Sequence, residues 1–154
     1  MVRTKCGFDD VPGGASGRVQ LACHGPTLLV TILFNPNYNP AVRNPPPVAG
    51  LGGLQALVDS GASESCIDNL IAAQLNLPIV DRREISGVHG PHMVNMHLAQ
   101  VHVTTLDCWI YGVFAGVDLA AGGQIHRALI GRTFLQHFTM IYEGRTGTVT
   151  IHNE

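Results

Sequence analysis

The apolar residues of this chain occur in short runs that end at glycine, proline, asparagine or aspartate. Residues 27–34 (TLLVTILF) form one such run, rich in β-branched and aliphatic side chains, and residues 54–58 (LQALV) form another. Side chains of this kind fit the pleated, half-buried surface of a strand, and runs this short are far below the length of a membrane span. The pattern predicts a mostly β domain with one or two short helices.

Turn and capping residues divide the rest of the chain into hairpins and short helices. Asp68 stands where it can cap a helix over Asn69–Leu75, which the following Asn-Leu-Pro would end. Glycines at both ends of the segment 87–90 suit the turn of a β-hairpin. We therefore predict a hairpin of 82–86 with 93–103, a strand at 108–115, a strand, glycine and short helix over 128–138, and a hairpin of 140–142 with 148–152.

Length and charge limit the classes of protein to which the chain can belong. Its 154 residues suit one domain, and 45% apolar residues are enough for a core. The formal net charge is −2 and no block of like charges occurs, so we expect no nucleic acid partner. Residues 1–10 contain no apolar leader segment and no apolar run approaches about 20 residues, so we expect a cytoplasmic protein without a membrane partner.

Two segments fall outside the strand pattern. Residues 1–18 are rich in Gly, Asp and Ser and lack periodicity, which predicts a flexible N-terminal tail before a domain over 19–154. Residues 35–53 contain repeated prolines and glycines, which predict a long surface loop. The cysteines are widely spread and show no C-x-x-C spacing, so we expect buried free thiols at Cys6, Cys23, Cys66 and Cys108.

The segment Leu57–Ala62 carries the strongest chemical signal. A carboxylate, Asp59, ends an apolar strand, and the small residues Ser60, Gly61 and Ala62 let the backbone turn and leave that carboxylate open to a ligand. Asp-Ser-Gly by itself is a common tripeptide, and an ordinary exit from a strand would produce it equally well. Its meaning therefore depends on the motifs that follow it.

Those motifs, taken in order, are similar to the retropepsin family of aspartic peptidases. An apolar pair followed by Asp59-Ser60-Gly61-Ala62, a short helix, a glycine-tipped hairpin and Leu129-Ile130-Gly131 before another helix match the family across about 27–151. The resemblance identifies a single-domain member of the bacterial or cellular type. It implies a small closed β-barrel, a flap hairpin, and aspartic endopeptidase activity on a polypeptide substrate without a cofactor or metal.

The family mechanism uses two carboxylates that share one proton, one acting as base on a water and the other as acid. This sequence has a single Asp-Ser/Thr-Gly motif, so the second carboxylate must come from another copy, in a homodimer. Asp118 was the other candidate, but no Ser/Thr-Gly follows it, and we interpret it as structural.

Further roles are implied by matching positions. Asp59 is the catalytic residue, and Ser60 and Gly61 support the dyad, the Ser60 hydroxyl by bridging the dimer axis. Arg132 matches an arginine that pairs with an acidic residue soon after the catalytic loop, where this chain offers Ser63 and then Glu64. The substrate-binding positions are expected at Ala62, at the flap tip Gly87, Val88, His89 and Gly90, and at Ile130 and Gly131.

Three other interpretations remain. The first is a catalytically silent module that keeps this fold for peptide binding or dimerisation. The second is a metal site at His89, His92 and His97, although their spacing fits no known ligand pattern and a strand would point His92 and His97 to opposite faces. The third is a serine-hydrolase elbow at Gly61–Ser65, which lacks the closing glycine.

Overall fold

The computed structural model describes residues 1–42 and 48–153 and is mostly β, as predicted. The helices are short, and none within the described residues is long and apolar enough to cross a bilayer. They are α1 (Gly17–His24), α2 (Asn69–Gln74) and α3 (Arg132–Leu135), with a 3-10 turn at Thr104–Leu106. The strands are β1 (Arg3–Lys5), β2 (Thr27–Leu33), β3 (Gly50–Val58), β4 (Cys66–Asp68), β5 (Ile79–Gly87), β6 (Gly90–Val103), β7 (Cys108–Val117), β8 (Ala128–Ile130), β9 (Thr139–Glu143) and β10 (Thr148–His152).

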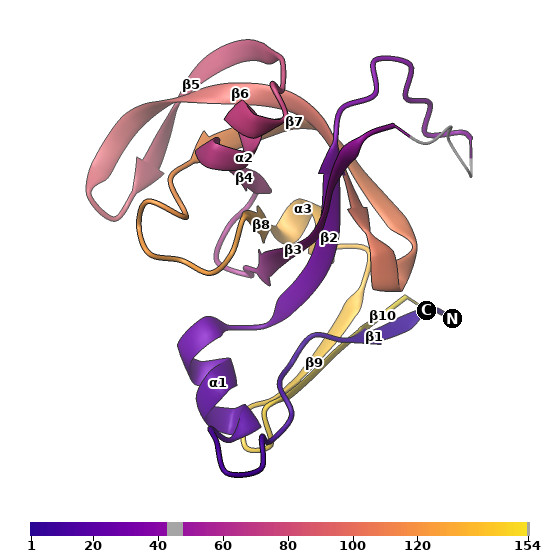
Figure 1. Ribbon diagram of the computed structural model, residues 1–154, viewed down its shortest axis with the longest axis vertical. Helices are drawn as coiled ribbons and strands as arrows, with labels where there is room; N and C mark the ends of the chain where they lie inside the picture. The colour runs from indigo at the N-terminus through magenta and orange to yellow at the C-terminus, as the bar shows by residue number, and fades with distance from the viewer. Residues whose placement is uncertain (43–47, 154) are drawn as a thin grey trace.

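Six strands close into a small barrel in the order β2-β3-β8-β4-β7-β6, because β2 pairs with β6 as well as with β3. β5 lies outside this ring and pairs only with β6, so the β5–β6 hairpin extends beyond the barrel (Figure 1). A second sheet of three strands, β1-β10-β9, lies below the barrel in the same view. The predicted closed β-barrel with a few short helices is therefore confirmed.

One hydrophobic core joins the barrel to the smaller sheet. It contains alternate residues of the barrel strands together with residues of β10 and of the N-terminal segment. Its fully enclosed members include Leu21, Leu28, Val30, Ile32, Ile67, Val101, Val103, Ile130, Val149 and Ile151. Because both sheets contribute to the same core, they form one unit.

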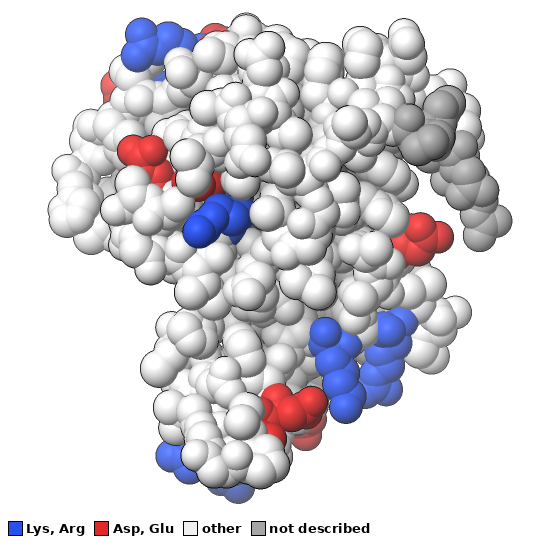
Figure 2. All heavy atoms as spheres, viewed as in Figure 1, with Lys and Arg blue, Asp and Glu red and all other residues white. Residues whose placement is uncertain are grey.

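Charged side chains are sparse on the face seen in Figure 2. Lysine and arginine lie there in small groups, several of them next to equally small groups of aspartate and glutamate. Most of this face is formed by uncharged residues, in keeping with the low share of charged residues, 13%, in the sequence. Local charge around a site is therefore set by a few individual side chains.

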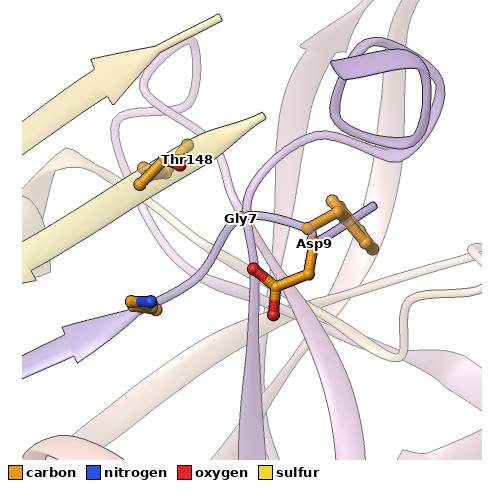
Figure 3. Close-up of a pocket in the computed structure, with 6 residues that line it drawn as sticks. Gly7, Asp9 and Thr148 are labelled. Atoms are coloured by element: carbon orange, nitrogen blue, oxygen red, sulfur yellow. The ribbon is translucent and has the colours of Figure 1, made fainter. Parts of the chain in front are cut away.

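The predicted flexible tail over residues 1–18 is wrong for much of that segment. β1 pairs with β10 in antiparallel register, and the backbone N–H groups of Cys6 and Phe8 donate to β10 and to the turn before it. Gly7 lies between Thr148 on β10 and Asp9, and a Cβ there would fall 2.1 Å from the Gly147 oxygen (Figure 3). The segment lacks a periodic pattern because a strand far along the chain, and not its own sequence, orders it.

The proposed domain start at residue 19 falls inside α1. The Ser16 side chain caps this helix by accepting a hydrogen bond from the Val19 N–H at 3.2 Å, and Leu21 anchors it in the core with 2% exposure. The polar sequence around this cap resembles a mobile terminus. The capping geometry shows that it begins a helix.

The loop predicted over 35–53 ends earlier than predicted, because its last residues belong to a strand. β3 begins at Gly50, since Ile32 and Leu33 of β2 pair with Leu51 and Gly50. Residues 43–47 of that loop lie outside the described residues. The glycines that predicted a loop therefore belong partly to a strand, where Gly53 takes a left-handed conformation (φ +65°) beside a register shift.

Asp68 does not cap α2 through its side chain, which corrects the predicted role. Its side chain is 1% exposed, and Oδ1 accepts hydrogen bonds from the N–H groups of Leu119 (2.9 Å) and Ala120 (3.2 Å). Asp68 therefore holds the segment after β7 against β4. This contact joins residues about fifty positions apart, so the local sequence could not predict it.

All four cysteines carry free thiols, as predicted. Their burial differs from the prediction, because Cys6 is buried, Cys66 and Cys108 are half-buried and Cys23 is exposed on α1. Burial raises the pKa of the Cys6 thiol to about 12, which keeps it protonated and inert.

Candidate active site

Asp59 lies at the end of β3, where the chain leaves the barrel. β3 runs parallel to β8 with Val58 opposite Ile130, and the Asp59 N–H donates to the Ile130 oxygen at 2.8 Å. The following turn is tight: the Gly61 N–H donates to Asp59 Oδ1 at 2.9 Å and the Ala62 N–H donates to the Asp59 oxygen at 3.2 Å. The carboxylate is thus half-buried and held by its own loop.

The residues after β8 hold this loop in place through hydrogen bonds, and we call these contacts the brace of the loop. The Ser65 hydroxyl accepts a hydrogen bond from the Gly131 N–H at 3.1 Å, in a buried position. The N–H groups of Arg132 and Thr133 donate to the oxygens of Ala62 (2.9 Å) and Ser63 (3.0 Å). Two segments far apart in sequence are therefore locked together by main-chain hydrogen bonds, which fixes the direction of the Asp59 carboxylate.

Arg132 completes the brace, although not by pairing with an acid as the family resemblance implied. Its guanidinium Nη1 donates to the main-chain oxygen of Ser60 at 2.8 Å, and no salt bridge joins it to Glu64 in the part of the chain that the structure describes. The Ser60 residue itself is exposed. Its hydroxyl is available at the molecular surface.

Gly131 is required where the two segments meet. A Cβ at this position would lie 2.6 Å from the Glu64 oxygen and 3.0 Å from the Ala62 oxygen, and both are main-chain atoms that cannot move aside cheaply. We predict that Gly131→Ala lowers the free energy of unfolding by about 1–3 kcal/mol, the usual cost of overpacking, and displaces the Asp59 loop. Urea unfolding measures the first effect.

A matched control for this prediction is Gly144→Ala, in the turn between β9 and β10. A Cβ there meets its nearest neighbour, the Tyr142 ring, at 3.4 Å, which is an ordinary contact. The control should change stability by no more than about 0.5 kcal/mol. Equal unfolding midpoints for the two variants would show that Gly131 is not a tight contact point.

A cavity of about 390 Å³ opens between the Asp59 loop and the β5–β6 hairpin. The loop and the start of β4 form one side of it, and the hairpin and β7 form the other. Its lining residues are Gly61, Ala62, Ser63, Glu64, Cys66, Arg83, Ile85, Ser86, Met96 and Ala115. A carboxylate loop next to an open cavity under a hairpin is an arrangement that can hold an extended peptide beside an acid–base group.

The structure brings together only part of the predicted site. Gly61 and Ala62, which belong to the same loop as Asp59, line the cavity. Ile130 and Gly131 are buried, Ile130 with 1% exposure, and neither lines the cavity, so their contact with a substrate stays a prediction. They remain essential to the site as its support.

The predicted hairpin tip is confirmed as a turn. Gly87 pairs with Gly90 and encloses the two-residue turn Val88-His89, and Gly90 takes a left-handed conformation (φ +99°). Val88 is 99% exposed, and none of these four residues lines the cavity. The stem of the hairpin, through Arg83, Ile85 and Ser86, faces the cavity instead.

Sequence reasoning missed the stem residues because it concentrated on the glycine tip. The signal was present in the alternation of the strand, since side chains on one face of β5 recur at every second residue. Cys66 was also missed as a site residue. Burial, and then the carboxylates of Asp59 and Glu64, raise the pKa of its thiol to about 11. The thiol that lines the cavity is therefore neutral and unreactive at about pH 7.

The histidine interpretation finds little support in the arrangement of the side chains. His92 is exposed while His97 is 6% exposed and packs its Nδ1 against the Leu77 oxygen at 3.4 Å. Within residues 1–42 and 48–153, no three His, Cys, Asp or Glu side chains gather as a metal site would require.

Comparison with known proteins finds similarity among solved structures. No family model matches the sequence, and no curated protein matches it. Among solved structures, the fold is similar to that of EIAV protease complexed with the inhibitor HBY-793, with 18% sequence identity and a TM-score of 0.46. The match covers 72% of this chain and 85% of that chain.

Proposed function

We propose that this chain is one half of a homodimeric aspartic endopeptidase of the retropepsin type, with Asp59 as its catalytic residue. The observation that carries the proposal is the position of the Asp59 loop. Asp59 follows a barrel strand and is held by its own turn and by the segment after β8, and the next residues of its loop, Gly61 and Ala62, line an open cavity under a hairpin. Asp59 forms no ion pair among the described residues, so no neighbouring cation neutralises its charge there.

The reaction needs two such carboxylates. In a dimer, the ionised one takes a proton from a bound water while the protonated one donates to the carbonyl oxygen of the scissile peptide. The water oxygen forms a bond to the carbonyl carbon and gives a tetrahedral intermediate. This intermediate collapses when the C–N bond breaks and the nitrogen takes up a proton, so the products are a carboxylic acid and an amine.

The substrate would bind as an added strand. An extended peptide satisfies its main-chain groups by pairing with exposed backbone of the loop and the hairpin, while alternate side chains enter pockets. The β5–β6 hairpin would act as the flap. Its two-residue glycine-flanked turn leaves the tip free to move when a peptide enters.

The first test is cleavage of an extended peptide library across pH, with and without inhibitors. We expect cleavage to be fastest at acidic to mildly acidic pH, because a shared-proton pair loses activity once both carboxylates are ionised. Chelators and reagents for serine or thiol nucleophiles should change the rate by less than about twofold, since the chemistry needs none of those groups. Complete inhibition by a chelator would favour the histidine interpretation.

Activity measured at low pH needs a stability control, because protonation of His126 is expected to destabilise the folded protein. This buried side chain shares a hydrogen bond with the Thr27 hydroxyl at 2.9 Å, while its Nδ1 has no partner among residues 1–42 and 48–153. Burial, then His24 and Arg127, lower its pKa, so the unfolded chain binds the proton more readily. Stability should therefore fall as pH drops below about 6.5, and unfolding must be measured at each assay pH.

A further inference from the structure

The cavity beside the Asp59 loop has an apolar floor. Met96 and Ala115 are 4% and 6% exposed, and Cys66 and Ile85 pack against them in a small cluster separate from the main core. The Cys66 thiol is neutral, as described above, so it adds to this apolar surface. A floor of this kind favours the methylene groups of a long substrate side chain.

A carboxylate without a partner stands at the rim of this floor. Glu64 lines the cavity and is exposed, and its side chain makes no salt bridge or hydrogen bond within the described residues. Its main-chain oxygen lies against Gly131, so the main chain of Glu64 is held by the brace of the active-site loop. The fold therefore sets the region of the rim that this side chain can reach.

The cation on the opposite side of the cavity, Arg83, is already paired with an acidic side chain. Arg83 Nε lies 3.1 Å from Asp81 Oδ2 on the same strand, so the two charges largely offset each other. With that pair set aside, Glu64 is the charged residue that lines the cavity. The Asp59 carboxylate and the Arg132 guanidinium, which donates to the Ser60 oxygen at 2.8 Å, lie at the neighbouring loop.

The field at the Cys66 wall of the cavity is negative. The charged groups that act on the Cys66 thiol, in the wall of the cavity, are Asp59 and Glu64, and both raise its pKa. A cationic group entering the cavity would meet the same field with the opposite sign, and would be attracted.

We infer that this cavity is a subsite for a long basic side chain, lysine or arginine, with Glu64 as the residue that determines the specificity. The methylene stem lies on Ile85, Met96 and Ala115, and the cationic end reaches Glu64 at the rim. The inference rests on the proposed function, since it names the substrate that the peptidase would select. An acidic side chain would be disfavoured at the same position.

The test compares lysine with norleucine, which has a similar straight stem but no charge, at each position of a set of extended peptides. At the position that enters the cavity, we expect wild-type protein to favour lysine in kcat/KM by about fivefold, the size of one partly exposed ion pair. Glu64→Gln should remove that preference. Glu64→Lys should reverse the charge preference of the cavity, so that this variant cleaves peptides with glutamate at that position faster than peptides with glutamine.

The matched control is Glu84→Gln, which removes the same charge from β5, the strand that faces the Glu64 loop across the cavity. Glu84 does not line the cavity, because neighbouring side chains of a strand point to opposite faces. Glu84→Gln should keep the lysine preference. Equal rates for lysine and norleucine in wild type, or an unchanged preference in Glu64→Gln, would overturn the assignment of Glu64.

Binding of the same peptides, followed by fluorescence anisotropy, separates this inference from the proposed catalysis. Preferential binding of lysine peptides that depends on Glu64 would support the subsite even without cleavage, and the absence of cleavage would then count against the peptidase. Cleavage without a lysine preference would overturn the subsite alone. No binding to any peptide would overturn both.

Discussion

Asp59→Asn should abolish peptide cleavage, lowering kcat/KM by about 10³-fold or more, because the amide cannot take a proton from water. The amide has nearly the same volume as the carboxylate, and its oxygen can still accept the Gly61 N–H at the position where Oδ1 now accepts it at 2.9 Å. The loop and the fold should therefore survive. Peptide cleavage and urea unfolding, measured on the same preparation, give the two readouts.

The matched control is Asp118→Asn, which makes the same chemical change elsewhere. Asp118 is exposed, and its Oδ1 accepts a hydrogen bond from Asn69 Nδ2 at 2.8 Å, which an amide oxygen can replace. This variant should retain activity within about twofold, since surface changes of this kind have small effects. Substantial activity in purified Asp59→Asn would remove Asp59 from the catalytic role. Loss of activity in Asp118→Asn would show that the effect of the change is not specific to Asp59.

Activity should also depend on dimerisation, because the sequence supplies one Asp-Ser-Gly motif and the reaction uses two carboxylates. A symmetric contact between two copies places each Asp59 beside its counterpart and each exposed Ser60 near the axis. Specific activity should then fall on dilution below the dissociation constant of the dimer. Sedimentation at the same concentrations shows whether the loss follows dissociation.

Mixing variants gives a sharper form of the same prediction. With a ninefold excess of Asp59→Asn over wild type and random pairing, about nine in ten wild-type copies enter heterodimers, so activity should fall about tenfold. The control is the same excess of Asp118→Asn, which should raise total activity. A fully active monomer would contradict the dimer and would reopen the search for a second carboxylate, beginning with Asp118.

The C-terminal hairpin is the candidate contact for this dimer. β9 is an edge strand of the three-stranded sheet, and its residues Ile141 and Tyr142 are 45% and 52% exposed. An apolar edge of this kind is a template for pairing with another chain. Two adjacent carboxylates repel when both are ionised, so the dimer should weaken as pH rises, which sedimentation can follow.

The sequence by itself determined the local elements of this protein. A run of β-branched and aliphatic residues predicted β2, the Gly87 and Gly90 pair predicted the β5–β6 turn, and an apolar strand followed by Gly131 predicted the step from β8 to α3. Each of these depends on residues a few positions apart, where propensity and turn chemistry act. The position of Asp59 at a strand end belongs to the same class of local information.

The tertiary structure alone decided how those elements meet. The pairing of β1 with β10 turned a predicted mobile tail into part of a sheet, and Asp68 was predicted as a helix cap but holds the segment after β7. The register between β5, β6 and β7 decided which side chains face the cavity, and so placed Arg83 and Met96 there but left the glycine tip outside. The physical reason is that strand pairing joins distant residues, and a shift of one residue reverses which face each side chain occupies.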